Sequence, residues 1–431
     1  MNKKLNIPNL IDKLIKISKT SIFKNASALL ILQAVNTILP LIIMPYMIKV
    51  LGFDGYGVYS FAFAISMYLV IVTDFGFGFT GVKLVSVNRD NSIQLSRIFH
   101  SIQIIKLFLV TVVLLIYTFL ILFLKQFTDN KLLFFLSFGI VIGQSMIPVW
   151  FFHGMEKMKY ITVINVLIRT IFALSLLYFV NSPDDIELAI FAQSFSFLFA
   201  GLSSIIIVYQ KFKLPLVLPK FSFLYRLFID SRHMYFSTLS ISMYTNANII
   251  ILGFYTGNTE VGVYAAVEKI IRAVQSLMSP ISQALFPHIS KDFAEISINK
   301  AIRKIYKISK YYLIILIIIS IALILVLPFV RNLLDIDQEG FIKVFYMMLP
   351  IVTIGSLNYL MGVVGLVNLN KDKLFSRATF IGGIFNVILC FVFVKMYGAL
   401  GVAFSLTIAE LVTLVFIISC FHRLNSNHIK S

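Results

Sequence analysis

The sequence predicts an all-α integral membrane protein of about twelve transmembrane helices, arranged as two six-helix bundles related by pseudo-two-fold symmetry. Three observations lead to this fold class. Of the 431 residues, 59% are hydrophobic and 13% are charged, whereas a soluble domain carries about 25% charged residues. The apolar residues form long uninterrupted runs, and one short glycine motif is written twice, about half a chain apart.

The apolar runs are long enough to cross a bilayer as helices. About 20 consecutive apolar residues span ~30 Å of hydrocarbon, and the runs at 101–124 and 311–330 meet this length. A transmembrane β-barrel would show alternating segments of about ten residues instead. The predicted spans are residues 26–50, 57–79, 101–124, 132–153, 161–180, 188–209, 233–254, 262–288, 311–331, 341–368, 378–396 and 400–421.

The net charge of +18 has a distribution that indicates topology. Most of the 37 Lys and Arg residues lie in the termini and in the connections on one side of the predicted spans. Short cytoplasmic loops carry this excess of positive charge in membrane proteins. We therefore expect a multi-pass membrane protein with both termini in the cytoplasm, and no nucleic-acid partner.

The chain divides into five predicted segments. The first of them is too basic and too long for a signal peptide and is expected to remain as an amphipathic helix on the inner leaflet of the lipid bilayer. The segments are a cytoplasmic amphipathic segment at 1–25, an N-terminal six-helix bundle at 26–210, a cytoplasmic linker at 211–232, a C-terminal six-helix bundle at 233–421 and a cytoplasmic tail at 422–431.

The repeated motif reads LGFDGYGVYSFA at 51–62 and LGFYTGNTEVGVYAA at 252–266. Each copy lies where the first span of a predicted half leaves the membrane on the outer side, and Gly57 and Gly262 are 205 residues apart. Glycine permits tight turns and close approach of two backbones. We interpret the motifs as matching turns of two halves rather than as ligand contacts.

The eighth predicted span carries a polar stripe. Glu268, Arg272, Gln275, Ser279 and Gln283 recur on one face of an otherwise apolar helix. At ~1.5 Å per residue Arg272 lies about 15 Å from the outer end of the span, near the middle of the bilayer. Charged groups at this depth are either paired or exposed to a watery cavity. Two interpretations follow: an ion pair between Glu268 and Arg272, or a cavity-facing arginine that binds an anionic substrate.

Other spans supply further candidates for substrate binding and ion coupling. Arg169 of the fifth span lies about 12 Å from the cytoplasmic end, too deep for easy snorkelling, so it is a candidate to line a cavity. Lys106 and Asp74 lie nearer the inner interface, where they either snorkel or pair with each other. Glu410 of the last span can carry an ion or pack against a neighbouring helix, and Glu268 and Asp74 are the other candidates for ion coupling. The remaining candidates for substrate binding are the amides of Gln33, Asn36, Asn246 and Asn248.

Soluble-enzyme chemistry is not visible in the sequence. The chain has no GxxxxGK[ST] phosphate loop, no HExxH motif and only two cysteines, both in apolar runs. We therefore expect no catalytic residue, no metal site and no cofactor. A transporter without a nucleotide site takes its energy from an ion gradient, of protons or sodium, or from consumption of the substrate on the outer side.

Four runs of this sequence resemble a known family: LPLIIMPYMIKVLGFDGYGVYSFAFAI at 39–65, DFGFGFTGVKLVSVNRD at 74–90, IPVWFFHGMEKMKYITVINVLIRTIF at 147–172 and IILGFYTGNTEVGVYAAVEKI at 250–270. They resemble the polysaccharide biosynthesis (Wzx-type) flippases, which share the multidrug/oligosaccharidyl-lipid/polysaccharide (MOP) superfamily with the multidrug and toxic-compound extrusion (MATE) transporters and the lipid II flippase. The chain departs from the pattern at Asn248, where many relatives have Asp, and at His153, where they have Gln.

The resemblance implies a MATE-like fold and a transport function. It implies movement of an undecaprenyl-pyrophosphate-linked oligosaccharide from the cytoplasmic to the periplasmic leaflet, by alternating access, before assembly of O-antigen, capsule or a related polysaccharide. A polysaccharide polymerase and a chain-length regulator are the implied protein partners. Family members are thought to use a cationic central cavity, which Arg272 and Arg169 would supply here.

Two alternatives to this function stay open at the level of sequence. A multidrug or cation exporter of the same fold would need an acidic cavity, and the mid-membrane arginines argue against it. A membrane enzyme of the same pathway, such as a polymerase or an acyltransferase, would need long extramembrane loops or a catalytic His/Asp set. The longest connections here have about 20 residues.

Overall fold

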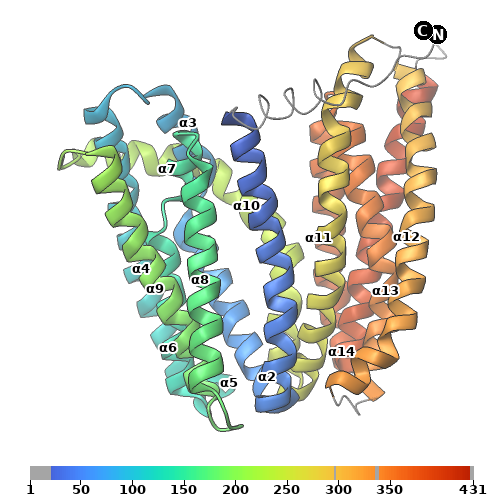
Figure 1. Ribbon diagram of the computed structural model, residues 1–431, viewed down its shortest axis with the longest axis horizontal. Helices are drawn as coiled ribbons and strands as arrows, with labels where there is room; N and C mark the ends of the chain where they lie inside the picture. Colours follow the sequence, from blue (N-terminus) through green and yellow to red (C-terminus); the bar gives the residue numbers. More distant parts are fainter. Residues whose placement is uncertain (1–20, 296–297, 335–338, 428–431) are drawn as a thin grey trace, which may run out of the picture.

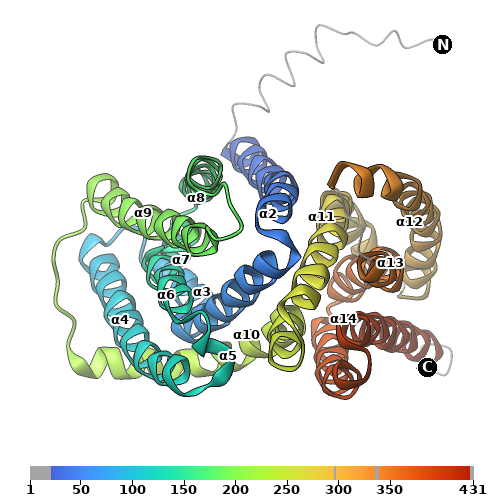
Figure 2. The ribbon, with the colours of Figure 1, turned by 90° about the horizontal axis from the view of Figure 1, so that it is seen from below.

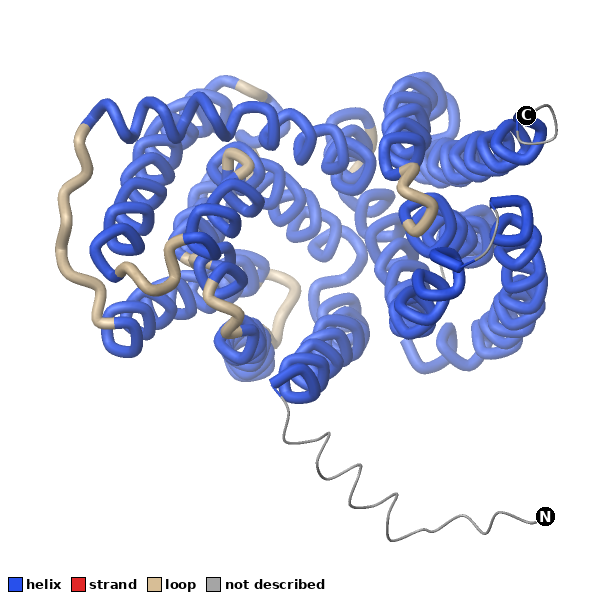
Figure 3. Tube along the Cα trace, turned by 90° about the horizontal axis from the view of Figure 1, so that it is seen from above, coloured by secondary structure: helices blue, strands red, loops and turns tan. Residues whose placement is uncertain are grey.

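The computed structural model describes residues 21–295, 298–334 and 339–427, and the described residues form helices and loops without a strand (Figure 3). The first eight helices are α2 (Ser21–Asp74), α3 (Phe77–Val87), α4 (Ser92–Phe123), α5 (Lys125–Thr128), α6 (Lys131–Met146), α7 (Val149–Gly154), α8 (Met158–Phe179) and α9 (Ile186–Phe212). The others are α10 (Phe221–Tyr255), α11 (Asn258–Glu295), α12 (Ile298–Leu334), α13 (Glu339–Tyr359), the π-helix η1 (Leu360–Val367) and α14 (Asp372–Asn427).

The helices divide into two groups. Helices α3 to α9 lie on one side and α11 to α14 on the other, with α2 and α10 between them (Figures 1 and 2). The start of α2 and the end of α14 lie at the same end of the molecule, as an even number of crossings requires (Figure 1). The predicted N-terminal amphipathic helix falls mostly in residues 1–20, outside the described part of the chain.

Within the described residues, eight helices are long and apolar enough to cross a membrane. Two of them, α2 and α14, contain one residue with non-helical angles, Gly52 (φ 69°) and Gly398 (φ 53°). Only glycine adopts such angles without strain, so each glycine joins two helical arms by a one-residue kink. At the second kink the Glu260 carboxylate accepts the backbone N–H of Ala399 at 2.7 Å and satisfies a donor that the broken helix exposes.

Another break separates α2 from α3. Phe75 (φ 43°) and Gly76 (φ 76°) both adopt left-handed angles. The Phe75 ring stacks on Phe228 and Tyr235 of α10, with ring centroids 4.2 and 4.7 Å apart. A side chain at Gly76 would lie 2.6 Å from the backbone nitrogen of Tyr235, so the break allows the end of α2 to pack closely on α10.

The outer surface of the helices is apolar. On α12 the side chains of Ile318, Leu325 and Phe329 are 60%, 74% and 70% exposed. Such large exposed apolar areas are rare on soluble monomers, whereas they are ordinary where the solvent is lipid. The all-helical, multi-span membrane character predicted from composition is therefore confirmed.

The two copies of the glycine motif meet in space. A side chain at Gly57 would collide with the carbonyl oxygen of Asn258, and one at Gly262 would collide with the carbonyl oxygen of Phe53. Thr259 donates a hydrogen bond to Asp54 at 3.3 Å, again across 205 residues. Helices α2 and α11 therefore cross in direct backbone contact at the motif, where α2, which lies between the two groups, touches the second group (Figure 2).

Candidate functional site

A cavity of about 550 Å³ lies between the two sides of the molecule. Its walls come from both arms of α2 and from α8, α9, α10 and α11. Pockets of this size ordinarily bind small molecules or parts of larger ones, with a few polar groups that fix orientation. The polar and charged residues that line it are Thr37, Tyr56, Tyr59, Ser60, Asn165, Arg169, Gln193, Glu268, Lys269, Arg272 and Ser276.

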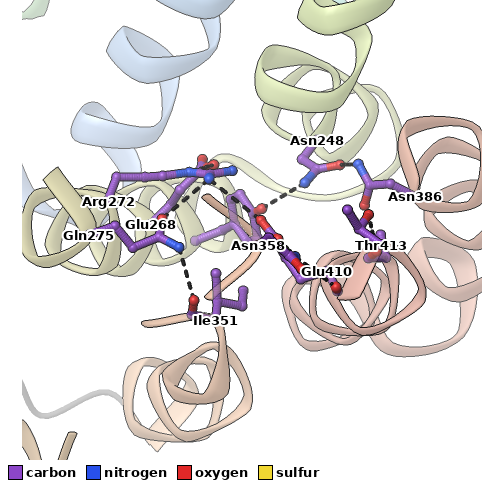
Figure 4. A network of polar contacts seen from close by, with 11 residues as sticks. Asn248, Glu268, Arg272, Gln275, Ile351, Asn358, Asn386, Glu410 and Thr413 are labelled. Atoms are coloured by element: carbon purple, nitrogen blue, oxygen red, sulfur yellow. Dashed lines mark hydrogen bonds and ion pairs between the residues drawn. The ribbon is translucent and has the colours of Figure 1, made fainter. Parts of the chain in front are cut away.

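Arg272 lies on the cavity wall and also has two carboxylates near it. Its Nε atom is 3.6 Å from Oε1 of Glu268, and its Nη1 atom is 3.9 Å from Oε1 of Glu410 (Figure 4). Nη1 also donates to Oε1 of Gln275 at 3.4 Å. Arg272 is therefore ion-paired and also faces the cavity, whereas its binding of an anionic substrate stays a prediction.

Glu410 is held from the opposite side by α13. Asn358 donates to Oε2 of Glu410 at 2.7 Å and to its backbone oxygen at 2.9 Å. Glu410 is 4% exposed and does not line the cavity. Gln275 donates to the backbone oxygen of Ile351 at 2.9 Å, so its amide also serves the contact between α11 and α13 (Figure 4).

The amide of Asn248 points into the C-terminal group of helices rather than into the cavity. It donates to the Tyr264 hydroxyl at 3.0 Å and accepts from Asn386 at 2.8 Å, and it is 1% exposed. Among the other predicted amides, Gln33 and Asn36 lie in α2 and Asn246 lies in α10, and their side chains are outside the described part of the structure.

The N-terminal side contributes one charged residue and an aromatic wall. Arg169 of α8 lines the cavity. The rings of Phe63 and Phe172 each stack on Tyr59 with centroids 6.2 Å apart and planes within 10° of parallel. The Tyr59 hydroxyl donates to Oε1 of Gln193 at 2.9 Å, which fixes the orientation of that ring.

Asp74 lies away from the cavity, at the C-terminal end of α2. The Lys106 ammonium donates to its carboxylate at 2.6 Å, and the lysine side chain is 3% exposed. A buried ammonium requires such a partner. Mutual pairing, one of the two arrangements expected from the sequence, is the one present.

Lys269 is a cavity residue that the sequence pattern did not single out. It lines the cavity from α11, its Nζ atom lies 5.7 Å from the centre of the Tyr56 ring, and it donates to the Tyr56 hydroxyl at 3.4 Å. Its position beside Glu268 places it just off the polar stripe, where a lysine on an amphipathic helix is usually interfacial. Its depth, seven residues or about 10 Å along the helix from Gly262, is the signal that would have identified it.

Comparison with known proteins identifies the family. Residues 22–293 match the family described as "Polysaccharide biosynthesis protein". The chain belongs to this family. Among curated proteins, one of Escherichia coli (strain K12) named "Putative O-antigen transporter" is 27% identical over 399 residues, which cover 91% of this chain and 95% of that protein. A protein of the same name from Shigella dysenteriae is 26% identical over 398 residues, which cover 92% of this chain and 98% of that protein.

Solved structures share the fold of this polysaccharide biosynthesis protein. An inward-facing MATE family transporter of the MOP superfamily aligns with a TM-score of 0.70 at 13% identity and covers 94% of this chain and 99% of its own. Lipid II flippase MurJ in an inward closed conformation aligns with a TM-score of 0.65 at 14% identity, and the alignment covers 94% of this chain and 90% of MurJ. The MATE-like fold and the family resemblance predicted from the sequence are confirmed.

The cavity of this family member offers charged and polar groups that can bind an anion. Within the described residues, no group of three or more His, Cys, Asp or Glu side chains could hold a metal ion. The described lining contains three cations and one carboxylate, so its formal charge is positive. Such a cavity is suited to an anion that also carries hydroxyl groups and apolar faces.

Proposed function

We propose that this chain is a flippase for undecaprenyl-pyrophosphate-linked oligosaccharide repeat units. It moves them from the cytoplasmic to the periplasmic leaflet of a bacterial inner membrane, for assembly of O-antigen, capsule or a related polysaccharide. The observation that carries the proposal is a cavity between two groups of helices whose charged lining is mainly cationic. The names of the curated relatives support the same substrate class.

The chemistry of the substrate matches the cavity. A lipid-linked sugar has an apolar tail that remains in lipid, a pyrophosphate and a polar head that needs a wet passage. Arg169 and Arg272 line that passage from opposite sides, and guanidinium groups bind phosphate oxygens in pairs. An exporter of cationic drugs would need an excess of carboxylates instead, and among the described lining residues only Glu268 is acidic.

Alternating access requires two rigid bodies that contact one another at one end at a time. The eight apolar helices give ten spans when each arm of α2 and of α14 is counted as one span. Helices α10 and α11 bring the number to twelve, enough for two bodies of six spans. The bodies are the six-helix bundles at 26–210 and 233–421, joined by the linker at 211–232. Both termini lie in the cytoplasm, and the crossing of Gly57 and Gly262 closes the outer end.

An ion gradient drives the cycle in this proposal. The sequence contains no phosphate loop that would allow ATP to do so. Glu268 and Glu410 are the preferred sites for a proton or a sodium ion, because both carboxylates lie within 4 Å of Arg272 and can exchange that partner for a cation. Asp74 is a third candidate, with Lys106 as its competing partner. A polymerase and a chain-length regulator receive the product at the outer face.

Loss of surface polysaccharide in cells tests the function. In a strain that lacks this chain, Arg272→Ala and Arg169→Ala should fail to restore surface polysaccharide while the protein remains in the membrane at its normal level. Lys343→Ala is the matched control, because Lys343 is exposed and pairs with Glu339 outside the cavity. Full restoration by both arginine variants would contradict the proposed role of the cavity.

A further inference from the structure

One wall of the cavity runs without interruption from a cation to a row of aromatic rings. The Lys269 ammonium lies 5.7 Å from the centre of the Tyr56 ring. The Tyr56 ring stacks on Tyr59 at 6.3 Å, and Tyr59 stacks on Phe63 at 6.2 Å. We refer to Lys269, Tyr56, Tyr59 and Phe63 as the cation-aromatic wall. It crosses from α11 to the second arm of α2, so both sides of the molecule contribute to it.

The charge on this wall differs from that on Arg272. Arg272 has two carboxylates within 4 Å, those of Glu268 and Glu410. Among the ion pairs of the described residues, none includes Lys269, whose partner is the neutral Tyr56. A cation beside an aromatic ring keeps its full charge for an arriving anion, whereas a cation beside two carboxylates must first exchange them.

The other end of the wall offers an open aromatic face. Tyr56 and Tyr59 are 1% and 5% exposed, whereas Phe63 is only partly buried. Phe172 covers the Tyr59 ring from α8, which leaves Phe63 as the ring of this wall that a ligand reaches. Gln193 lines the same cavity; its Oε1 accepts from Tyr59 and its Nε2 donates to Ser196 at 3.4 Å, so one amide hydrogen remains for a ligand hydroxyl. An aromatic face beside an amide is suited to a sugar ring, which has apolar C–H faces and a rim of hydroxyl groups.

We propose that the cation-aromatic wall binds the junction of the substrate, where the pyrophosphate joins the first sugar. Lys269 contacts a phosphate oxygen, and Phe63 packs against the face of that sugar. The inference rests on the proposed function, because it assigns positions within the same cavity. It makes Phe63 a residue that selects for the first sugar, since a prenyl pyrophosphate alone would satisfy Lys269 but leave the ring uncovered.

Binding of two probes to the purified full chain in detergent tests this assignment. The probes are farnesyl pyrophosphate and its conjugate with one hexose, measured by titration calorimetry. The wild type should bind the hexose conjugate about three- to tenfold more tightly than farnesyl pyrophosphate, which is the range expected for one stacked ring. Phe63→Leu should remove this gain and leave the sugar-free probe unchanged. Phe63→Tyr should keep it.

The cation has its own pair of variants. Lys269→Met should weaken the binding of both probes about tenfold, because the loss of one charged contact to phosphate costs on this order. Lys269→Arg keeps the positive charge and should retain most of the affinity. Phe195→Leu, at a ring of α9 that is 45% exposed and outside the cavity lining, should leave both affinities unchanged. Thermal unfolding of each variant checks that it is folded.

The outcomes separate this inference from the proposed function. Equal binding of both probes by the wild type would overturn the sugar position at Phe63. So would an equal loss of the tighter binding to the conjugate in Phe63→Leu and Phe63→Tyr. In both cases the flippase proposal stands. If Lys269→Met leaves both affinities unchanged, the phosphate position is overturned. If the folded wild type binds neither probe, the proposed function itself is contradicted.

Discussion

Alanine at Gly57 should open the outer end of the molecule. A Cβ atom there would collide with the carbonyl oxygen of Asn258 and lie 2.7 Å from its carbonyl carbon, whereas ordinary contact begins near 3.4 Å. Helices α2 and α11 must therefore separate by at least about 0.7 Å, the difference between those two distances. Overpacking of this kind costs about 1–3 kcal/mol, and each 1.4 kcal/mol changes the ratio of closed to open molecules about tenfold.

Accessibility of the cavity from outside measures this shift. Ser60 lines the cavity and is 7% exposed, so Ser60→Cys serves as a reporter once Cys390 and Cys420 are replaced by serine. A membrane-impermeant maleimide added to cells should label the reporter about tenfold faster in the Gly57→Ala background. Gly257→Ala is the matched control, because an added Cβ there meets nothing within 4 Å. Equal labelling rates in the two backgrounds would refute the assignment of the glycine crossing as the outer closure.

Three further predictions address charge and topology. Arg272→Lys should restore polysaccharide only partly, because an ammonium cannot pair bidentately with phosphate; full restoration would indicate that charge alone matters. Asp74→Asn should lower the thermal midpoint, since it leaves the buried Lys106 ammonium without its carboxylate, and adding Lys106→Met should recover most of the loss; no recovery would argue against a pairing role. A reporter fused after Asp185 should be periplasmic and one fused after Asn299 cytoplasmic; the reverse would overturn the orientation.

The features that the sequence could predict are those set by local periodicity. Helical spacing placed Glu268, Arg272 and Gln275 on one face of α11, and the structure brings all three together. The length of the apolar runs indicated membrane helices. The glycine motif indicated a turn, and the chain turns at Gly52, although by a one-residue kink within α2 rather than by a loop.

The features that the sequence could not predict depend on contacts between distant segments. Glu410 reaches Arg272 across 138 residues only because α14 packs against α11. Asn248 faces Asn386 instead of the cavity because α14 also covers α10. The contact between Gly57 and Gly262 follows from the crossing of α2 and α11. Periodicity within one helix predicts on which face of that helix a residue lies. It does not predict which other helix packs against that face.

Translocation by the purified chain is the most direct test of the account. The chain is reconstituted into liposomes that carry a fluorescent prenyl-pyrophosphate-linked sugar and an imposed gradient of protons or of sodium. The fraction of label that an external reductant can quench is followed with time. The account predicts that the protected inner-leaflet fraction becomes accessible at a rate proportional to the amount of protein, and that Arg169→Ala and Arg272→Ala slow it while Lys343→Ala does not. A rate no higher than that of empty liposomes, with the chain folded and inserted, would contradict the proposed function.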